Sequence, residues 1–203
     1  TSVAVNINAV TALAASDLDD LTTLNTNIAG FSNTGNIAAI TLTNDGGGGD
    51  GNVDFGTLET IIDNYKAREA TVSFTLQAGD TIDVDTTDEL SAILADIASN
   101  NLTLTDQAIT VNSGVSVSVA NAKSLAADTS GTVTATITST ERVSSLVELR
   151  QPDGSNNEEN AFTIAIHSND ATASTAANLN TINAATSVAV NINAVTALAA
   201  SDL

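Results

Sequence analysis

The stretch TVSFTLQAGDTIDVDTTDELSAILADIASN, residues 71–100, carries the pattern on which the fold prediction rests. Its first part alternates apolar with small or polar residues, at Val72, Phe74 and Leu76, which is the period-two signature of a β-strand. A second short strand, TIDVD, follows. The phrase TTDELSAILADI then places Leu90 and Ile93 on one helix face, behind threonines whose hydroxyl groups can satisfy the first amides of a helix. The stretch therefore predicts strands followed by a short helix.

The same phrase recurs along the chain. Further inward-facing sets are Val3, Val5 and Ile7; Ala38, Ile40 and Leu42; Leu102 and Leu104 with Val115, Val117 and Val119; Val133, Ala135 and Ile137; and Phe162, Ile164 and Ile166. Helical phrases follow, among them GTLETIIDNY behind Thr57, STERVSSLVEL behind Ser139 or Thr140, and STAANLNTI behind Ser174 or Thr175. We divide the chain into units at 1–35, 36–70, 71–100, 101–131, 132–160 and 161–185.

Units of similar length whose loops vary are typical of solenoids, in which successive turns of chain stack in register. We therefore expect a mainly β fold with short helices. More specifically, we expect a right-handed parallel β-solenoid, or β-helix, with one helix-bearing face and about six coils per 185-residue period.

The 18 residues TSVAVNINAVTALAASDL occur twice without a difference, at 1–18 and at 186–203. A stacked layer leaves its last strand edge unpaired, and such an edge is a template for another strand. We interpret 1–185 as one full tandem repeat and 186–203 as the start of the next identical repeat. A designed cap or a cloning duplication is the alternative. The expected partners are neighbouring copies of the repeat, joined end to end either covalently or non-covalently.

Composition narrows the function classes. The chain has 24 acidic and 5 basic residues and a formal net charge of −19, which disfavours nucleic acid and anionic lipid as partners. The absence of cysteine excludes disulfides and thiolate metal sites. No apolar run approaches the roughly 20 residues of a membrane span. Neither an initiator methionine nor a signal peptide is present, so we expect an excerpt of something longer.

Acidic side chains supply the candidate metal ligands. In NDGGGGDGNVDFGTLE the residues Asp50, Asn52, Asp54 and Glu59 offer oxygen ligands in and after a glycine-rich turn, which is the ligand type that Ca²⁺ requires. The segment DGNVDFGTLE is similar to part of an EF-hand-type or dockerin-type loop. The alternative is a surface loop between strand and helix that binds nothing.

A second, weaker metal candidate is the pair Asp83 and Asp85, which would lie together on the outer face of a strand. Like charges so placed repel unless a cation or water separates them. Acidic outer faces also favour lateral contacts between fibres through divalent cations. The alternative is that the acidic residues serve solubility alone.

No catalytic residue is predicted. His167 is the only histidine, and its neighbours Ser168 and Asp170 on a strand end do not make a nucleophile–base arrangement. Paired acids for glycoside hydrolysis remain open by number alone, although one tyrosine, four phenylalanines and five basic residues leave little to build a sugar-binding groove. We therefore expect a protein that is not an enzyme.

The phrases LTLTDQAITV, GTVTATITST and STAANLNTI resemble the giant tandem-repeat surface proteins of cyanobacteria and other Gram-negative bacteria. These are long secreted adhesins, S-layer-like proteins or matrix fibres. The resemblance implies an extracellular or cell-surface location, frequent dependence on calcium, and repeats without catalytic activity.

These observations together predict a structural repeat of an extracellular bacterial filament or giant surface protein, forming a stiff rod by coil stacking. One alternative is a calcium-dependent adhesin module that binds a glycan or a protein through a pocket in the loops near 44–56 or 151–160. The other is a polysaccharide-degrading β-helix enzyme. Ca²⁺ is the only cofactor expected.

Overall fold

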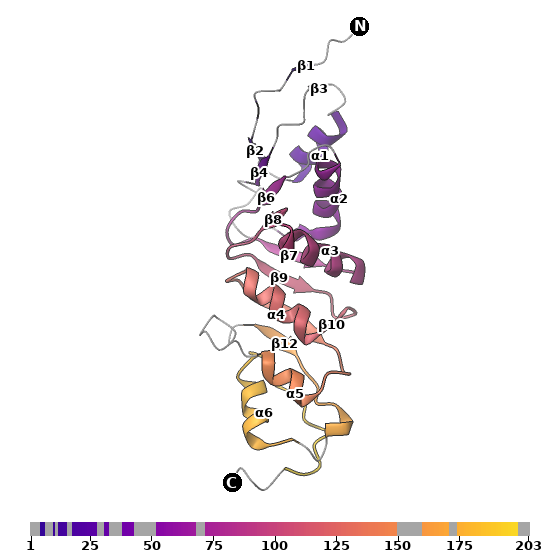
Figure 1. Ribbon diagram of the computed structural model, residues 1–203, viewed down its shortest axis with the longest axis vertical. Coiled ribbons are helices and arrows are strands. Elements are labelled where there is room, and N and C mark those ends of the chain that lie inside the picture. Colours follow the sequence, from indigo (N-terminus) through magenta and orange to yellow (C-terminus); the bar gives the residue numbers. More distant parts are fainter. Residues whose placement is uncertain are drawn as a thin grey trace. The chain divides into compact units, whose positions relative to one another are not determined.

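The computed structural model describes residues 5–6, 10, 12–15, 18–27, 31–32, 38–42, 52–67, 72–149, 160–170 and 174–198 (Figure 1). The chain divides into two compact units. Unit 1 comprises Thr1–Val84 and Asp88–Gln107, and unit 2 comprises Asp85–Thr87 and Ala108–Leu203. Each unit has its own set of buried apolar side chains.

Unit 1 is built on short parallel strands. The strands β2 (Ala12–Ala15), β4 (Ala39–Leu42), β6 (Ser73–Thr75) and β8 (Leu102–Thr103) form one sheet in the order of the chain (Figure 1). The strand β5 (Asn52–Asp54) pairs with β7 (Thr81–Val84), and β1 (Val5–Asn6) pairs with β3 (Phe31–Ser32). Every one of these pairs is parallel.

Helices separate the strands of unit 1 and fill much of its core. These are α1 (Leu18–Asn27), α2 (Phe55–Lys66) and α3 (Thr87–Ala98), of which α1 and α2 pack together. The helix α2 buries a complete face, consisting of Phe55, Leu58, Ile61, Ile62 and Tyr65. The ring of Tyr65 meets the ring of Phe74 edge-on, with centroids 5.8 Å apart, which is a favourable aromatic geometry.

Unit 2 has the same alternation of strands and helices. The strand β11 (Val133–Ile137) pairs in parallel with β9 (Ala108–Val111), β10 (Ser116–Val117) and β12 (Ala161–Thr163). The helices are α4 (Val119–Asp128), α5 (Val143–Leu146) and α6 (Ala176–Asn183). Two 3₁₀ turns, η2 (Val147–Leu149) and η4 (Ser168–Asp170), complete the unit.

The predicted fold class is wrong. The protein is an α/β fold whose parallel sheets are neither closed nor coiled, and it is not a mainly β right-handed solenoid with about six coils. The physical reason lies in the helices, because α2 and α3 each have 12 residues and bury apolar faces of their own. The described strands have only two to five residues, so helices contribute as much to the core as strands do.

The alternation that predicted the strands is nevertheless confirmed at most positions. Ile82 and Val84 are buried, as are the sets Val72, Phe74 and Leu76; Val133, Ala135 and Ile137; and Phe162, Ile164 and Ile166. Leu58, Ile61, Ile62 and Tyr65 form the buried helix face that their spacing predicts. The division into six units stays a prediction.

Two buried amide side chains join segments next to the strands, one in each unit. Gln107, fully buried in unit 1, donates from Nε2 to the carbonyl oxygens of Leu76 (3.2 Å) and Gln77 (2.8 Å). Asn160, buried in unit 2, accepts the amide of Val133 on its Oδ1 at 2.8 Å. Because a buried amide without partners is costly, these bonds hold the joined segments in place.

Candidate functional site

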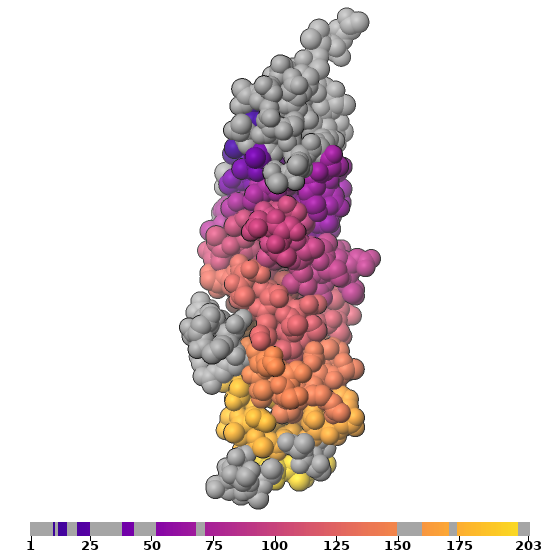
Figure 2. Space-filling model, viewed as in Figure 1, coloured from indigo at the N-terminus to yellow at the C-terminus, as the bar shows by residue number. Residues whose placement is uncertain are grey.

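The second copy of the duplicated segment begins directly after α6, and its first residues are held tightly in unit 2. The main-chain oxygen of Asn160 accepts the amide of Ser187 at 2.8 Å and its hydroxyl at 3.0 Å. The hydroxyl of Thr186, a buried residue, donates to the carbonyl oxygen of Phe162 at 2.8 Å. The yellow atoms in Figure 2 mark the C-terminal part of unit 2, which includes both α6 and the described part of this segment.

The copy then continues as a parallel neighbour of the chain that follows β12. The amide of Asn191 donates to the carbonyl oxygen of Ile164, and the carbonyl oxygen of Asn191 accepts the amide of Ile166, both at 2.9 Å. This makes a parallel bridge between Ala165 and Asn191. The second copy is therefore paired with a strand that precedes it in the chain.

The first copy is paired in the opposite sense. In unit 1, Val5 and Asn6 lie in register with Phe31 and Ser32, which come later in the chain. Its strand β2 pairs with the later strand β4, so that Leu13 lies opposite Ile40. The spacing is the same in both units, because 26 positions separate Val5 from Phe31 and Ala165 from Asn191.

Identical residues thus show two different neighbours, one earlier and one later in the chain. A strand inside a sheet has two neighbours, and successive residues direct their main-chain groups to opposite edges. Asn191 directs its amide and its carbonyl oxygen to the preceding strand, so Val190 directs its own to the other edge. Val5, the counterpart of Val190, lies opposite Phe31 in the first copy.

Within residues 186–198 the structure describes a strand neighbour along one edge only, and this stretch exposes apolar side chains. Ile192 and Leu198 are the large hydrophobic residues that stand exposed in the described part of the chain, at 49% and 52%. Leu13, the counterpart of Leu198, is only partly exposed because β4 lies beside it. Asp17 is the one charged residue among the 18 of the segment, and Asp202 is its copy. Exposed apolar side chains on a nearly uncharged edge mark a surface for association.

The predicted calcium ligands do not form one group in the described residues. Asp50 lies outside them, and Asn52 is exposed on β5. Asp54 is the N-cap of α2, because its Oδ1 accepts the amide of Thr57 at 2.7 Å and the hydroxyl of Thr57 at 2.6 Å. The expectation that Thr57 caps this helix is therefore wrong, and the carboxylate before it takes that role.

Glu59 faces α3 and not the turn that precedes α2. Burial, a hydrogen bond with Asp96 and the negative charges of Asp96 and Asp63 together raise the pKa of Glu59 to about 8, and the positive charge of Lys66 opposes them. Asp96 is itself buried and accepts Lys66 Nζ at 3.0 Å. At pH 7 Glu59 is therefore mostly protonated, and a protonated carboxyl group is a poor ligand for Ca²⁺.

The second candidate pair for a metal, Asp83 and Asp85, consists of two carboxylates with different neighbours. Asp83 is partly exposed on β7, in register with Asp54 of β5. Asp85 is exposed, and its Oδ1 accepts Nδ2 of Asn112 at 3.2 Å. Across the described ranges, no three Asp, Glu, His or Cys side chains gather closely enough to hold a metal ion. Calcium binding near Asp50 and Asn52 stays a prediction.

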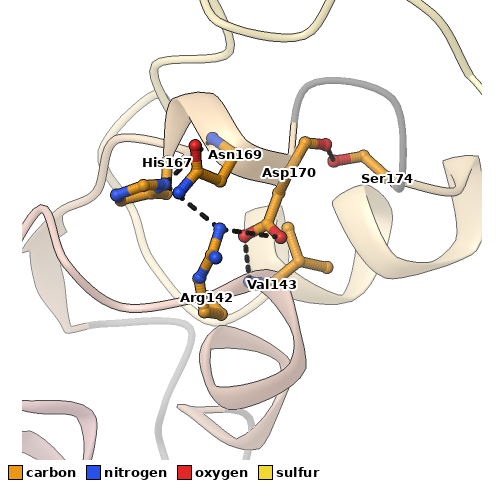
Figure 3. Close-up of polar contacts among 6 residues, drawn as sticks. All are labelled: Arg142, Val143, His167, Asn169, Asp170 and Ser174. Carbon is orange, nitrogen blue, oxygen red and sulfur yellow. Dashed lines mark hydrogen bonds and ion pairs between the residues drawn. The ribbon is translucent and has the colours of Figure 1, made fainter.

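His167 belongs to a cluster that sequence reasoning missed (Figure 3). Arg142 lies between His167 and Asp170, with its Nη1 3.2 Å from His167 Nδ1 and 3.4 Å from Asp170 Oδ1. The amide of Asn169 also donates to His167 Nδ1, at 2.9 Å. An Nδ1 atom that accepts hydrogen bonds leaves the ring proton on Nε2.

The carboxylate of this cluster caps a helix. Asp170 Oδ2 accepts the amide of Val143, the first residue of α5, at 3.0 Å. The expectation that Ser139 or Thr140 caps this helix is wrong, since its N-cap residue, Arg142, makes no side-chain capping bond. A residue almost thirty positions away does this instead, and local sequence carries no signal for such a cap. The cluster thus ties η4 to the start of α5.

The described surface has two shallow pockets, one in each unit. One, of about 290 Å³ in unit 1, is lined by Thr22, Asp54, Gly56, Thr57, Thr60 and Ile61. The other, of about 400 Å³ in unit 2, is lined by Val119, Ala120, Lys123, Ser124, Glu141, Ser145 and Glu148. The adhesin alternative places its pocket in the loops near 44–56 or 151–160. Of these, residues 44–51 and 151–159 lie outside the described residues, so this alternative stays a prediction.

Two further findings bear on classification. Among the helices described, none is long and apolar enough to cross a membrane. Comparison with models of protein families, with curated proteins and with solved structures finds no match to this chain.

Proposed function

We propose that the chain is a structural repeat of an extracellular bacterial filament or giant surface protein, and that the duplicated segment is the strand layer that neighbouring copies share. The observation that carries the proposal is the pairing of identical residues with an earlier strand in unit 2 and with later strands in unit 1. A segment flanked on both sides by strands would satisfy both pairings at once.

Burial supports the same conclusion. The apolar alternation of the segment matches that of the buried strands elsewhere, yet Ile192 and Leu198 are exposed. Exposed apolar area is stabilising only when it is covered, at about 25 cal/mol per Å². A following copy would bring the counterparts of β3 and β4 against this edge, as β4 lies against Leu13 in unit 1.

The charge distribution fits a structural role outside a cell. The net charge of −19 resides almost entirely outside the duplicated segment. Acidic surfaces keep neighbouring fibres apart, whereas the shared edge is nearly uncharged. The extracellular location rests on the resemblance of the sequence to giant repetitive surface proteins.

A cysteine reporter tests the proposal, because the chain has no cysteine of its own. Leu198→Cys is made in the 203-residue chain and in a longer chain that continues after residue 203 with residues 19–203 again. We expect a soluble thiol reagent to react at least about tenfold more slowly in the longer chain, since a covered thiol is less accessible.

Leu13→Cys is the matched control, because it has the same neighbouring residues and β4 lies beside it in both chains. Its rate of reaction should change little between the two chains. Both rates are measured at a concentration at which the 203-residue chain is monomeric. Equal rates for Leu198→Cys in the short and the long chain would then show that consecutive repeats do not share the segment, and the proposed function would fall.

A further inference from the structure

Resting on the proposed function, we propose that separate chains join by strand exchange: residues 186–198 of one chain displace strands β1 and β2 of a second copy and pair with its strands β3 and β4. The partner is a second copy of this chain. The site consists of two strand edges in separate sheets, that of β3 (Phe31–Ser32) and that of β4 (Ala39–Leu42).

Because the two copies are identical in sequence, residues 186–198 of another chain can make the same pairs with β3 and β4 as β1 and β2 make within one chain. Val190 and Asn191 are the counterparts of Val5 and Asn6, which lie opposite Phe31 and Ser32. Ala197 and Leu198 are the counterparts of Ala12 and Leu13, which lie opposite Ala39 and Ile40. The edge that holds the first copy therefore cannot distinguish it from the second copy of another chain.

The occupied edge explains why exchange is required. In unit 1 the strand β2 already lies along β4, so a second chain can pair there only by displacing it. The strand β2 contributes little buried side-chain area, because Ala15 is its one buried residue. In β4, by contrast, Ile40 and Leu42 are both buried. The core of unit 1 therefore survives the loss of β2 far better than the loss of β4.

The balance of interactions favours exchange. Before it, the described residues of each copy are paired with one neighbouring strand or segment. Afterwards one copy is paired along both edges, Ile192 and Leu198 are covered, and the displaced copy regains its conformational freedom. The opposing cost is the translational and rotational freedom that two chains lose on association.

Disulfide trapping tests the partner and the register together. Ala197→Cys is made in one chain and Ala39→Cys in another. Both positions are exposed, and adjacent strands lie about 4.8 Å apart, within the range of Cα separations that a disulfide bridges. We expect the oxidised mixture to give a cross-linked heterodimer on a non-reducing gel.

Thr163→Cys, equally exposed on β12, replaces Ala39→Cys in the control mixture. We expect the pair with Ala39→Cys to cross-link at least about tenfold faster than the control pair, because only its thiols are held side by side. Equal rates would overturn the exchange. The thiol-protection experiment on the longer chain is unaffected by this outcome, so failure of the exchange and failure of the shared layer are distinguishable.

The same substitution at two identical positions gives an independent test. Leu198→Asp alters the incoming strand, and we expect the association constant, measured by sedimentation of the 203-residue chain, to fall at least about tenfold. Leu13→Asp weakens the strand to be displaced, and we expect the association constant to rise. A fall in both variants would indicate a contact without displacement and would overturn the proposal.

An internal lock covers the case in which Leu13→Asp does not fold. The pair Ala12→Cys and Ala39→Cys in one chain, which lie in register, joins β2 to β4 when oxidised and keeps the fold intact. We expect the oxidised chain to stay monomeric at concentrations where the reduced chain associates. Association of the oxidised, locked chain would overturn the exchange.

Discussion

Replacing Phe74 by alanine should remove a fully buried aromatic side chain from the core of unit 1. Phe74 is fully buried on β6, and its ring meets that of Tyr65 edge-on at 5.8 Å. Truncating a buried phenylalanine costs about 3–5 kcal/mol, and the lost ring pair contributes about 0.5–1.5 kcal/mol. Because each kcal/mol shifts the Tm by about 2–4 °C in a chain of this length, we expect the Tm to fall by about 6–20 °C.

Calorimetry measures the fall in Tm, and hydrogen exchange shows where it originates. Amides of unit 1 should lose protection in Phe74→Ala, while those of unit 2 keep theirs. Ile164→Ala is the matched control, since Ile164 is buried in unit 2 to the same degree and should give the reverse pattern. A loss below about 0.5 kcal/mol, the range of surface substitutions, would show that Phe74 does not belong to the core.

Further predictions concern the polar contacts. Asp54→Ala should lower the free energy of unfolding by about 1 kcal/mol through loss of the α2 cap, measured by urea unfolding; Asn52→Ala, two residues before Asp54 on the same strand, is the control. Asp170→Ala should cost about 1–3 kcal/mol, because it leaves the amide of Val143 without its acceptor, whereas Asp170→Asn should cost less. The pKa of Glu59 is about 8 in the folded state and 4.5 ordinarily, so between these pH values the folded state holds a proton that the unfolded state has lost. The contribution of this group to stability is therefore complete at low pH and is lost as the pH rises towards 8. Glu59→Gln should therefore gain Tm relative to the natural chain between pH 5.5 and pH 8.5, and a constant difference in Tm would contradict the reasoning. If calcium binds near Asp50, a chelator lowers the Tm, and an unchanged Tm removes that prediction.

The positions of strands and helices could be predicted from the sequence because they depend on local pattern. Ile82 and Val84 alternate with polar residues, and Leu58, Ile61 and Tyr65 recur at helical spacing, so burial follows from periodicity. The fold class could not be predicted in this way, because the pattern does not indicate how much of the core each helix or strand fills. The 12-residue helices with complete apolar faces, α2 and α3, outweigh the short strands that suggested a solenoid.

The site residues were harder to predict for a related reason. Asp54 has the side chain of a metal ligand, yet a carboxylate directly before a helix can also be an N-cap, and its Oδ1 accepts the amide of Thr57 at 2.7 Å. Glu59 and Asp170 depend on partners far along the chain, Asp96 and Val143. The duplication itself was visible in the sequence, but the two different partners of its copies became apparent only from the strand pairing.

The scarcity of charge in the duplicated segment has a consequence for how the material would respond to ionic strength. Lengthening would depend on an edge with one carboxylate in 18 residues and should be nearly insensitive to added salt. Sideways bundling would have to overcome the repulsion of 24 acidic side chains, which 0.15 M salt screens beyond about 8 Å. If the chain forms the proposed filaments, a rise in ionic strength should therefore promote their lateral bundling and leave their elongation unchanged.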